Sequence, residues 1–195
     1  MYSRTTHTTL LAKLRDPSDI SAWDEFCERY GDLILAFARG QGLQAADCDD
    51  VLQDVLLILT GSMPRFVYDP EKGKFRSFLK TVTLRAVFKK FRQKRGGEEQ
   101  EPDEEALEAL EGDPAAGARW EEEWRQYHLR SAMKRIATEF NESDQAAFRL
   151  YALEQRSAAD TAQAVGLSVD GVYQTKSRIV ARLSALIELQ VKEEG

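Results

Sequence analysis

Apolar positions follow a helical period along almost the whole chain. The stretch SAWDEFCERYGDLILAFARGQG, residues 21–42, spaces its aromatic and aliphatic side chains three and four positions apart. The glycines Gly40 and Gly42 then provide a signal for the end of a helix. Strand signals, meaning alternating β-branched residues between tight glycine turns, are absent from the sequence. We therefore expect an all-α fold.

A second helix is expected at DCDDVLQDVLLILTG, residues 47–61, with two distinct faces. The inward stripe consists of apolar residues at helical spacing: Val51, Leu52, Val55, Leu56 and Leu59. The opposite face carries two acids, an amide and one apolar residue: Asp50, Gln53, Asp54 and Leu57. The core does not need this second face.

A third helix is expected at FRSFLKTVTLRAVFKKFRQKR, residues 75–95, after a loop at 61–74 that contains turn residues. Its predicted core stripe is Phe75, Phe78, Leu79, Val82 and Ala86. A different face is predicted to hold Arg76, Lys80, Thr83 and Val87.

Charge changes the interpretation of this third helix. The whole chain has a formal net charge of −6, yet residues 75–95 contain eight cations and no acid. With no acid at i±4, the cations repel one another, and a polyanion such as a phosphate backbone would relieve that repulsion. A phenylalanine exposed among them could stack on an unpaired base. We therefore favour nucleic-acid binding over the alternative, a solvated charged face that suits the helix dipole.

The next segment reverses the sign of the charge. Residues 96–125 contain twelve acids and two arginines, together with four glycines and two prolines. This composition predicts an acidic linker between a helical domain at 1–95 and a second one at 126–195. EEALEAL, 104–110, could form a short helix, and ARWEEEWRQYHLRSAMKRIATEF, 118–140, indicates the start of the next one.

The second domain carries an independent signal in RSAADTAQAVGLSVDGVYQTKSRIVARLSALI, residues 156–187. Ser157 is a good N-cap, Gly166 suits a left-handed C′ position, and Ser168 can cap the helix that follows. This order is typical of a helix-turn-helix, whose second helix can enter a major groove. Two packed helices in an ordinary bundle remain the alternative.

The sequence contains no catalytic constellation. His7 and His128 have no adjacent nucleophile, and the spacing of Cys27 and Cys48 is not that of a metal site. Phosphate-binding glycine motifs, a secretory leader and an apolar run long enough to span a membrane are absent. We expect a cytoplasmic protein that is not an enzyme, binds no cofactor or metal and does not insert into membranes.

These segments, in this order, resemble the extracytoplasmic-function group of sigma-70 family sigma factors. DCDDVLQDVLLIL resembles the polymerase-binding segment of that family, and YDPEKGKFRSFLKTVTLRAVFKKFRQKR its promoter-melting and minus-ten-reading segment. GLSVDGVYQTKSRIVARL is similar to its minus-thirty-five-reading helix. RDPSDISAWDEFCERYGDLILAFARGQGL further resembles a subgroup abundant in planctomycete-type bacteria. The chain departs from the family pattern at Phe78, Arg85 and Lys89, where Trp, Asn and an acid are usual.

The resemblance implies a protein that binds core RNA polymerase and promoter DNA, is a monomer when free, and has an anti-sigma protein as a candidate partner. It implies polymerase binding by Asp50, Gln53, Asp54 and Leu57. It implies minus-ten DNA contacts by Arg76, Phe78, Lys80, Arg85, Lys89, Lys90 and Arg92. It implies minus-thirty-five contacts by Ser168, Val169, Asp170, Tyr173, Gln174, Lys176, Ser177 and Arg178.

Two other functions remain open from the residues alone. A stand-alone helix-turn-helix regulator would bind a palindromic site as a dimer. An adaptor would use the basic helix at 75–95 to bind an acidic protein.

Overall fold

The computed structural model describes residues 7–66, 75–94, 96 and 112–194. Within these ranges every regular element is helical, which confirms the all-α prediction. The chain divides into two compact units, Met1–Tyr127 with Glu193–Gly195 and His128–Lys192. The predicted short helix at 104–110 and residues 67–74 of the loop predicted at 61–74 lie outside the described residues. The first part of that loop is helical instead, because a helix that begins at Ala45 continues to Ser62 and a 3-10 turn spans Met63–Arg65.

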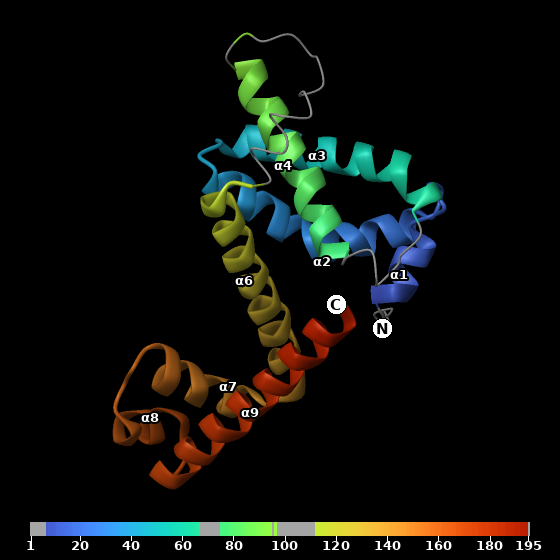
Figure 1. Ribbon diagram of the computed structural model, residues 1–195. Helices are drawn as coiled ribbons and strands as arrows, with labels where there is room; N and C mark the ends of the chain where they lie inside the picture. Colours follow the sequence, from blue (N-terminus) through green and yellow to red (C-terminus); the bar gives the residue numbers. More distant parts are fainter. Residues whose placement is uncertain (1–6, 67–74, 95, 97–111, 195) are drawn as a thin grey trace. The chain divides into compact units, whose positions relative to one another are not determined.

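The described part of the first unit is a small helical cluster. Its elements are α1 (His7–Lys13), α2 (Ile20–Gly40), α3 (Ala45–Ser62), a 3-10 turn η1 (Met63–Arg65), α4 (Phe75–Lys94) and the first turns of α6 (Pro114–Glu139). Figure 1 shows α4 (green) running across α3 (teal), and these two helices share an extensive contact. The crossing places two surfaces from distant parts of the sequence beside each other.

Local signals define the ends of α2. The Asp19 side chain accepts a hydrogen bond of 3.0 Å from the Ala22 amide, which caps the N-terminus. The helix ends at Gly40, and Gly42 follows with a φ of +97°, a conformation that favours glycine. The predicted glycine stop is therefore confirmed.

Aromatic side chains form much of the core of this unit. Phe37 packs edge-on against Trp120, with ring centroids 5.2 Å apart, and Tyr30 stacks on Trp124 at 6.2 Å. Both tryptophans belong to α6 and are almost fully buried. The structure thus differs from the predicted linker at 96–125, since α6 begins at Pro114 and its first turns complete the core. Three acids between the two tryptophans hid this short apolar stripe in the sequence.

The two predicted core stripes are largely observed. In α3, Val51, Val55 and Leu59 are buried, whereas Leu52 and Leu56 are half-buried. In α4, four of the five predicted core residues are buried, and Phe78 is half-buried.

Thr83 and Val87 were predicted to lie on a different face of α4 from the core stripe, but the buried surface of α4 includes them. Both are buried, and the Thr83 hydroxyl donates a 2.8 Å hydrogen bond to the Leu79 carbonyl. The reason is that α4 packs against α2 and α3 at once, so its buried arc is wider than one helical stripe.

The second unit contains the helix-turn-helix. After the rest of α6 come α7 (Glu142–Phe148), a π-helical turn η2 (Arg149–Leu153), α8 (Ala158–Val165) and α9 (Val169–Glu194). The apolar residues at its centre are Ala132, Ile136, Phe148, Ile179 and Leu186.

The turn between α8 and α9 has the predicted local structure. The Ser157 hydroxyl oxygen accepts a 3.0 Å hydrogen bond from the Asp160 amide at the start of α8. Gly166 has a φ of +70°, in the left-handed region. The Ser168 hydroxyl oxygen accepts a 3.0 Å bond from the Gly171 amide in the first turn of α9. These contacts fix where α9 begins, and therefore which of its residues stand at its N-terminal end.

Candidate nucleic-acid interface

The outer face of α3 contains the four residues predicted to bind polymerase. Asp50 and Gln53 are exposed, Asp54 is half-buried, and Leu57 is 70% exposed. An apolar side chain this exposed, next to carboxylates, combines an apolar centre with a charged rim, as protein interfaces do. The structure brings these residues together on one face. Their role stays a prediction.

The acidic side of α3 is paired with the basic end of α4. The paired residues, here called the charge ladder, are Asp47, Asp50 and Asp54 of α3 and Lys89, Lys90 and Lys94 of α4. Between carboxylate oxygen and Nζ, the rungs measure 3.2 Å for Asp54–Lys89, 2.5 Å for Asp50–Lys90 and 2.6 Å for Asp47–Lys94. Lys90 also lies 3.6 Å from Asp47.

The sequence predicted that the cations of α4 repel one another and that a polyanion would relieve this repulsion. In the structure the charge ladder already relieves part of it. The compensating acids come from α3, and the paired residues are separated by 35, 40 and 47 positions along the chain. Asp47 was not predicted to belong to the site. A sequence signal for it did exist, because Asp47 lies three and seven residues before Asp50 and Asp54 and therefore on the same helix face.

The pairing shifts the acid–base equilibria of both partners. Hydrogen bonding from Lys94 lowers the pKa of the Asp47 carboxyl, and the Lys90 and Lys94 charges act in the same direction. Hydrogen bonding to Asp50 raises the pKa of the Lys90 ammonium. Both groups are therefore held in their charged forms around neutral pH.

The other predicted minus-ten cations lie in different surroundings. Arg76 forms an ion pair with Glu121 and lies over the Trp124 ring, 5.1 Å from its centroid. Lys80 is half-buried, and so is Arg92. Arg85, by contrast, is exposed and makes no ion pair with any described residue.

Phe78, the predicted base-stacking residue, is half-buried against another ring. Phe66 stacks on it with centroids 5.0 Å apart and an interplanar angle of 28°. One face of the Phe78 ring is thus occupied by a side chain from the end of η1. The rest of the predicted loop after Phe66, residues 67–74, lies outside the described residues.

In the second unit, the N-terminal part of α9 is exposed. Val169 and Tyr173 are 40% and 47% exposed, and most of the other predicted minus-thirty-five residues are exposed as well: Ser168, Asp170, Gln174, Lys176, Ser177 and Arg178. Tyr151 of η2 was not predicted to take part. Its ring contacts Tyr173 edge-on at 5.6 Å and lies under the Lys176 ammonium at 5.3 Å.

A family model supports the resemblance for the first unit. Residues 26–96 match the model described as Sigma-70 region 2. This segment of the chain is therefore similar to region 2 of the sigma-70 family. The match includes all of α3, η1 and α4, and therefore both the acidic face and the basic helix.

Two further comparisons were made. A search of curated proteins gave no match. A solved structure, that of CnrH in complex with the cytosolic domain of CnrY, is 22% identical in sequence to this chain. The alignment covers 93% of this chain and 96% of that chain, with a TM-score of 0.35.

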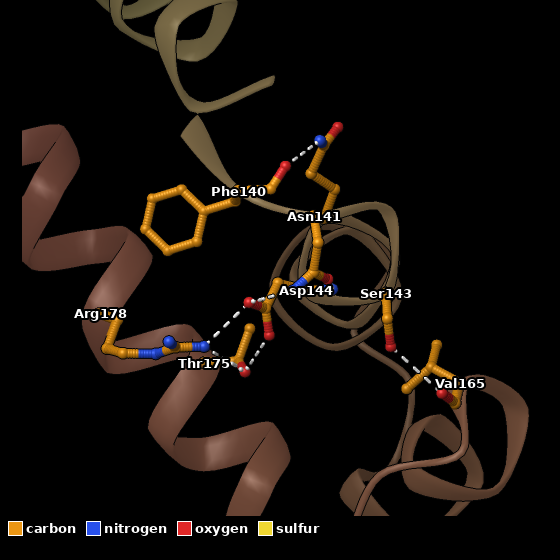
Figure 2. A network of polar contacts seen from close by, with 8 residues as sticks. Phe140, Asn141, Ser143, Asp144, Val165, Thr175 and Arg178 are labelled. Atoms are coloured by element: carbon orange, nitrogen blue, oxygen red, sulfur yellow. Dashed lines mark hydrogen bonds and ion pairs between the residues drawn. The ribbon is translucent and has the colours of Figure 1, made fainter. Parts of the chain in front are cut away.

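Arg178 makes an ion pair within the second unit. Figure 2 shows the Asp144 carboxylate between α7 and α9, where it accepts 2.8 Å and 2.9 Å bonds from the Thr175 hydroxyl and the Arg178 guanidinium. The Asn141 side chain accepts a 2.8 Å bond from the Asp144 amide and caps α7. Arg178 therefore links α9 to α7, and its DNA contact stays a prediction.

The histidine and cysteine side chains considered as catalytic or metal-binding residues have the following surroundings. His128 is buried, and its Nδ1 lies 3.0 Å from Oε1 of Gln190. Cys27 and Cys48 are free thiols, and burial raises the pKa of both. Among the described residues, no three acidic, histidine or cysteine side chains are grouped so as to hold a metal ion. None of the described helices is both long and apolar enough to cross a membrane.

Proposed function

We propose that the protein is an RNA polymerase sigma factor of the extracytoplasmic-function group, which binds core polymerase and directs initiation at specific promoters. The observation that carries this proposal is the presence of two parts in one chain. A region 2 match covers α3 and α4, and a helix-turn-helix with capped helices and a left-handed Gly166 follows it. A stand-alone regulator, with the first part as a dimerisation or sensor domain, would not account for the region 2 match.

Polymerase docking is assigned to the outer face of α3. Leu57 supplies exposed apolar area, and Asp50 and Gln53 supply charge and hydrogen bonds around it. A partner surface that fits this face is apolar at its centre with basic and polar groups at its rim.

Minus-ten recognition and opening are assigned to α4. Arg85 is exposed to meet a phosphate, and the half-buried Phe78 offers an aromatic ring near the start of the helix. Taking a base out of the duplex costs on the order of a few kcal/mol. Stacking on an aromatic ring, worth roughly 1–3 kcal/mol per base, offsets much of that cost.

Minus-thirty-five recognition is assigned to the start of α9. Asp170, Tyr173 and Gln174 are exposed there and have side chains suited to base edges, while Lys176 suits a phosphate. Neither DNA contact needs to be strong. Once polymerase holds both units, the second contact forms at a high effective concentration.

The proposal is tested with purified full-length protein, core RNA polymerase and fragmented genomic DNA. The expected results are co-purification with the core enzyme and discrete run-off transcripts that depend on the added protein. A dimer that binds a palindrome without polymerase would establish the stand-alone regulator instead. Binding to an acidic protein with no DNA-dependent activity would establish the adaptor.

A matched pair of variants locates the docking face. Leu57→Ser and Ile20→Ser each remove an exposed aliphatic side chain of the first unit, 70% and 73% exposed. Both should leave the melting temperature nearly unchanged, because exposed positions contribute little to stability. Only Leu57→Ser should weaken polymerase binding. Equal loss in both variants, or in neither, would remove the assignment of α3 as the docking face.

A further inference from the structure

The charge ladder joins the two surfaces to which the proposed function assigns different partners. Its acids belong to the face of α3 that is assigned to polymerase. Its lysines belong to the helix α4 that is assigned to DNA. In the free protein the carboxylates of α3 are therefore the counterions of the lysines of α4, with carboxylate oxygen to Nζ distances of 2.5–3.2 Å.

The fold does not require the ladder to hold the two helices together. The α3–α4 interface already buries apolar residues of both helices, including Val51, Val55, Leu79 and Val82. Each ladder pair of 3.2 Å or less has at least one partner that is 42–54% exposed, and ion pairs open to water in this way add little to stability on top of such a core. The paired charges do, however, limit binding by other ions. A cation that binds the α3 carboxylates, or an anion that binds the α4 lysines, must compete with the existing pairs.

We propose that the charge ladder couples the two binding events, so that a basic partner bound to the acids of α3 frees the lysines of α4 for a nucleic-acid phosphate. This inference rests on the proposed function for the identity of the basic partner, core polymerase. Coupling of this kind is reciprocal, so DNA bound to α4 also strengthens docking on α3.

Exposure indicates where the exchange begins. The Asp50 side chain is 54% exposed even while it contacts Lys90, whereas the Lys90 side chain is only 17% exposed. A partner cation can therefore reach Asp50 before the rung opens. A phosphate that approaches Lys90 in the free protein must instead displace two carboxylates, those of Asp50 and Asp47.

The size of the effect follows from counterion release. Each additional lysine–phosphate contact steepens the dependence of log K on log salt by about 0.9 for duplex DNA. The same relation makes each contact worth roughly eightfold in affinity at 0.1 M salt. Three freed lysines would thus give roughly two to three additional units of slope.

The first test uses the free full-length protein and a fluorescent duplex, with anisotropy measured over a range of salt concentrations. The ladder variant is Asp47→Asn with Asp50→Asn and Asp54→Asn. The control variant makes the same change in net charge at exposed acids that form no ion pair with any described residue: Glu28→Gln, Asp32→Asn and Asp49→Asn. The ladder variant should bind more tightly than the control variant and show a steeper slope by roughly two units or more.

Equal affinities and slopes for the two variants would overturn the proposal, because only the net charge would then matter. Circular dichroism melting shows whether the ladder variant is folded. If it is not, the single changes Asp50→Asn and Asp49→Asn, at neighbouring positions of α3, make the same comparison with an expected difference of roughly eightfold at 0.1 M salt.

The second test asks whether the lysines are the groups released. Lys90→Gln should weaken DNA binding several-fold more in the ladder variant than in the wild type. Arg85→Gln should weaken it equally in both backgrounds, because Arg85 lies outside the ladder. Equal costs of Lys90→Gln in the two backgrounds would show that the carboxylates never restrained the lysine.

A third measurement separates this inference from the proposed function. Lys90→Gln should weaken promoter binding more in the complex with core polymerase than in the free protein. If the first two tests succeed but the wild type binds no polymerase, the proposed function is wrong. The conclusion that the α3 carboxylates restrain the α4 lysines would still hold. If polymerase binds and supports transcription but Lys90→Gln costs the same in both states, the coupling fails alone.

Discussion

Replacing Asp144 by alanine should destabilise the second unit strongly, because the Asp144 carboxylate satisfies a buried donor. The Thr175 side chain is 3% exposed, and its hydroxyl donates a 2.8 Å bond to Asp144. Leaving such a donor without a partner costs about 1–3 kcal/mol. The bond to Arg178, whose side chain is 59% exposed, adds no more than about 1 kcal/mol. We expect a total loss of about 2–3 kcal/mol.

The matched variant is Thr175→Val, which removes the hydroxyl and keeps the shape of the side chain. Asp144 then keeps its bonds to Arg178 and Asn141, so the expected cost is below about 1 kcal/mol. In the double variant the buried donor is gone as well. The double variant should therefore recover about 1–2 kcal/mol of the loss seen in Asp144→Ala.

Hydrogen exchange during a urea titration, followed by mass spectrometry, measures these free energies in the full chain. Peptides from α7 and α9 report on the second unit, and peptides from α2 and α3 serve as an internal control that should not change. Additive effects of the two substitutions would refute the reasoning, since the hydroxyl would then not depend on the carboxylate. A cost of Asp144→Ala below about 1 kcal/mol would refute it too.

Three further predictions concern single side chains. Gln174→Ala should relax the base preference at one or two upstream base pairs, at a cost of about 1–3 kcal/mol in binding free energy. Lys176→Ala should instead weaken binding to all sequences alike and reduce the slope of log K against log salt by about one unit. A promoter-library selection at several salt concentrations would show both effects. Arg85→Gln should lower run-off transcription from a duplex promoter more than from one with a pre-melted bubble, and equal losses would make Arg85 a simple electrostatic anchor. The side-chain bond from Arg182 lowers the pKa of Glu139. The difference in unfolding free energy between wild type and Glu139→Gln should therefore be constant above about pH 5 and should shrink as the pH falls through that lowered pKa. Denaturant titrations from pH 6 to pH 3 would detect this change.

The helix-turn-helix could be predicted from the sequence because its signals are local. Ser157, Gly166 and Ser168 act on backbone groups within a few residues, so their effect does not depend on the rest of the fold. The docking residues of α3 could be placed on one face for the same reason, because the helical period alone decides it. In both cases the residue types and their spacing along the chain are enough to predict the local structure.

Contacts between distant segments could not be predicted in this way. The charge ladder depends on how α3 and α4 cross, which a one-dimensional charge count does not contain. The bond between Arg178 and Asp144 joins residues 34 positions apart, so the link that Arg178 makes between α9 and α7 has no local sequence signal. Trp120 and Trp124 were assigned to a linker because the acids between them dominated the local charge.

The structure changes what the eight cations of residues 75–95 imply. A count along the chain treats them as equivalent, but α3 neutralises Lys89, Lys90 and Lys94, and Glu121 pairs with Arg76. An approaching phosphate in the free protein would therefore meet Arg85 at full strength and the ladder lysines only after displacing carboxylates. It follows that the strength of α4 as an anion-binding surface depends on what is bound to α3. An acidic protein can thus concentrate positive charge on one helix at little cost in self-repulsion and still use that charge when a partner takes the acids away.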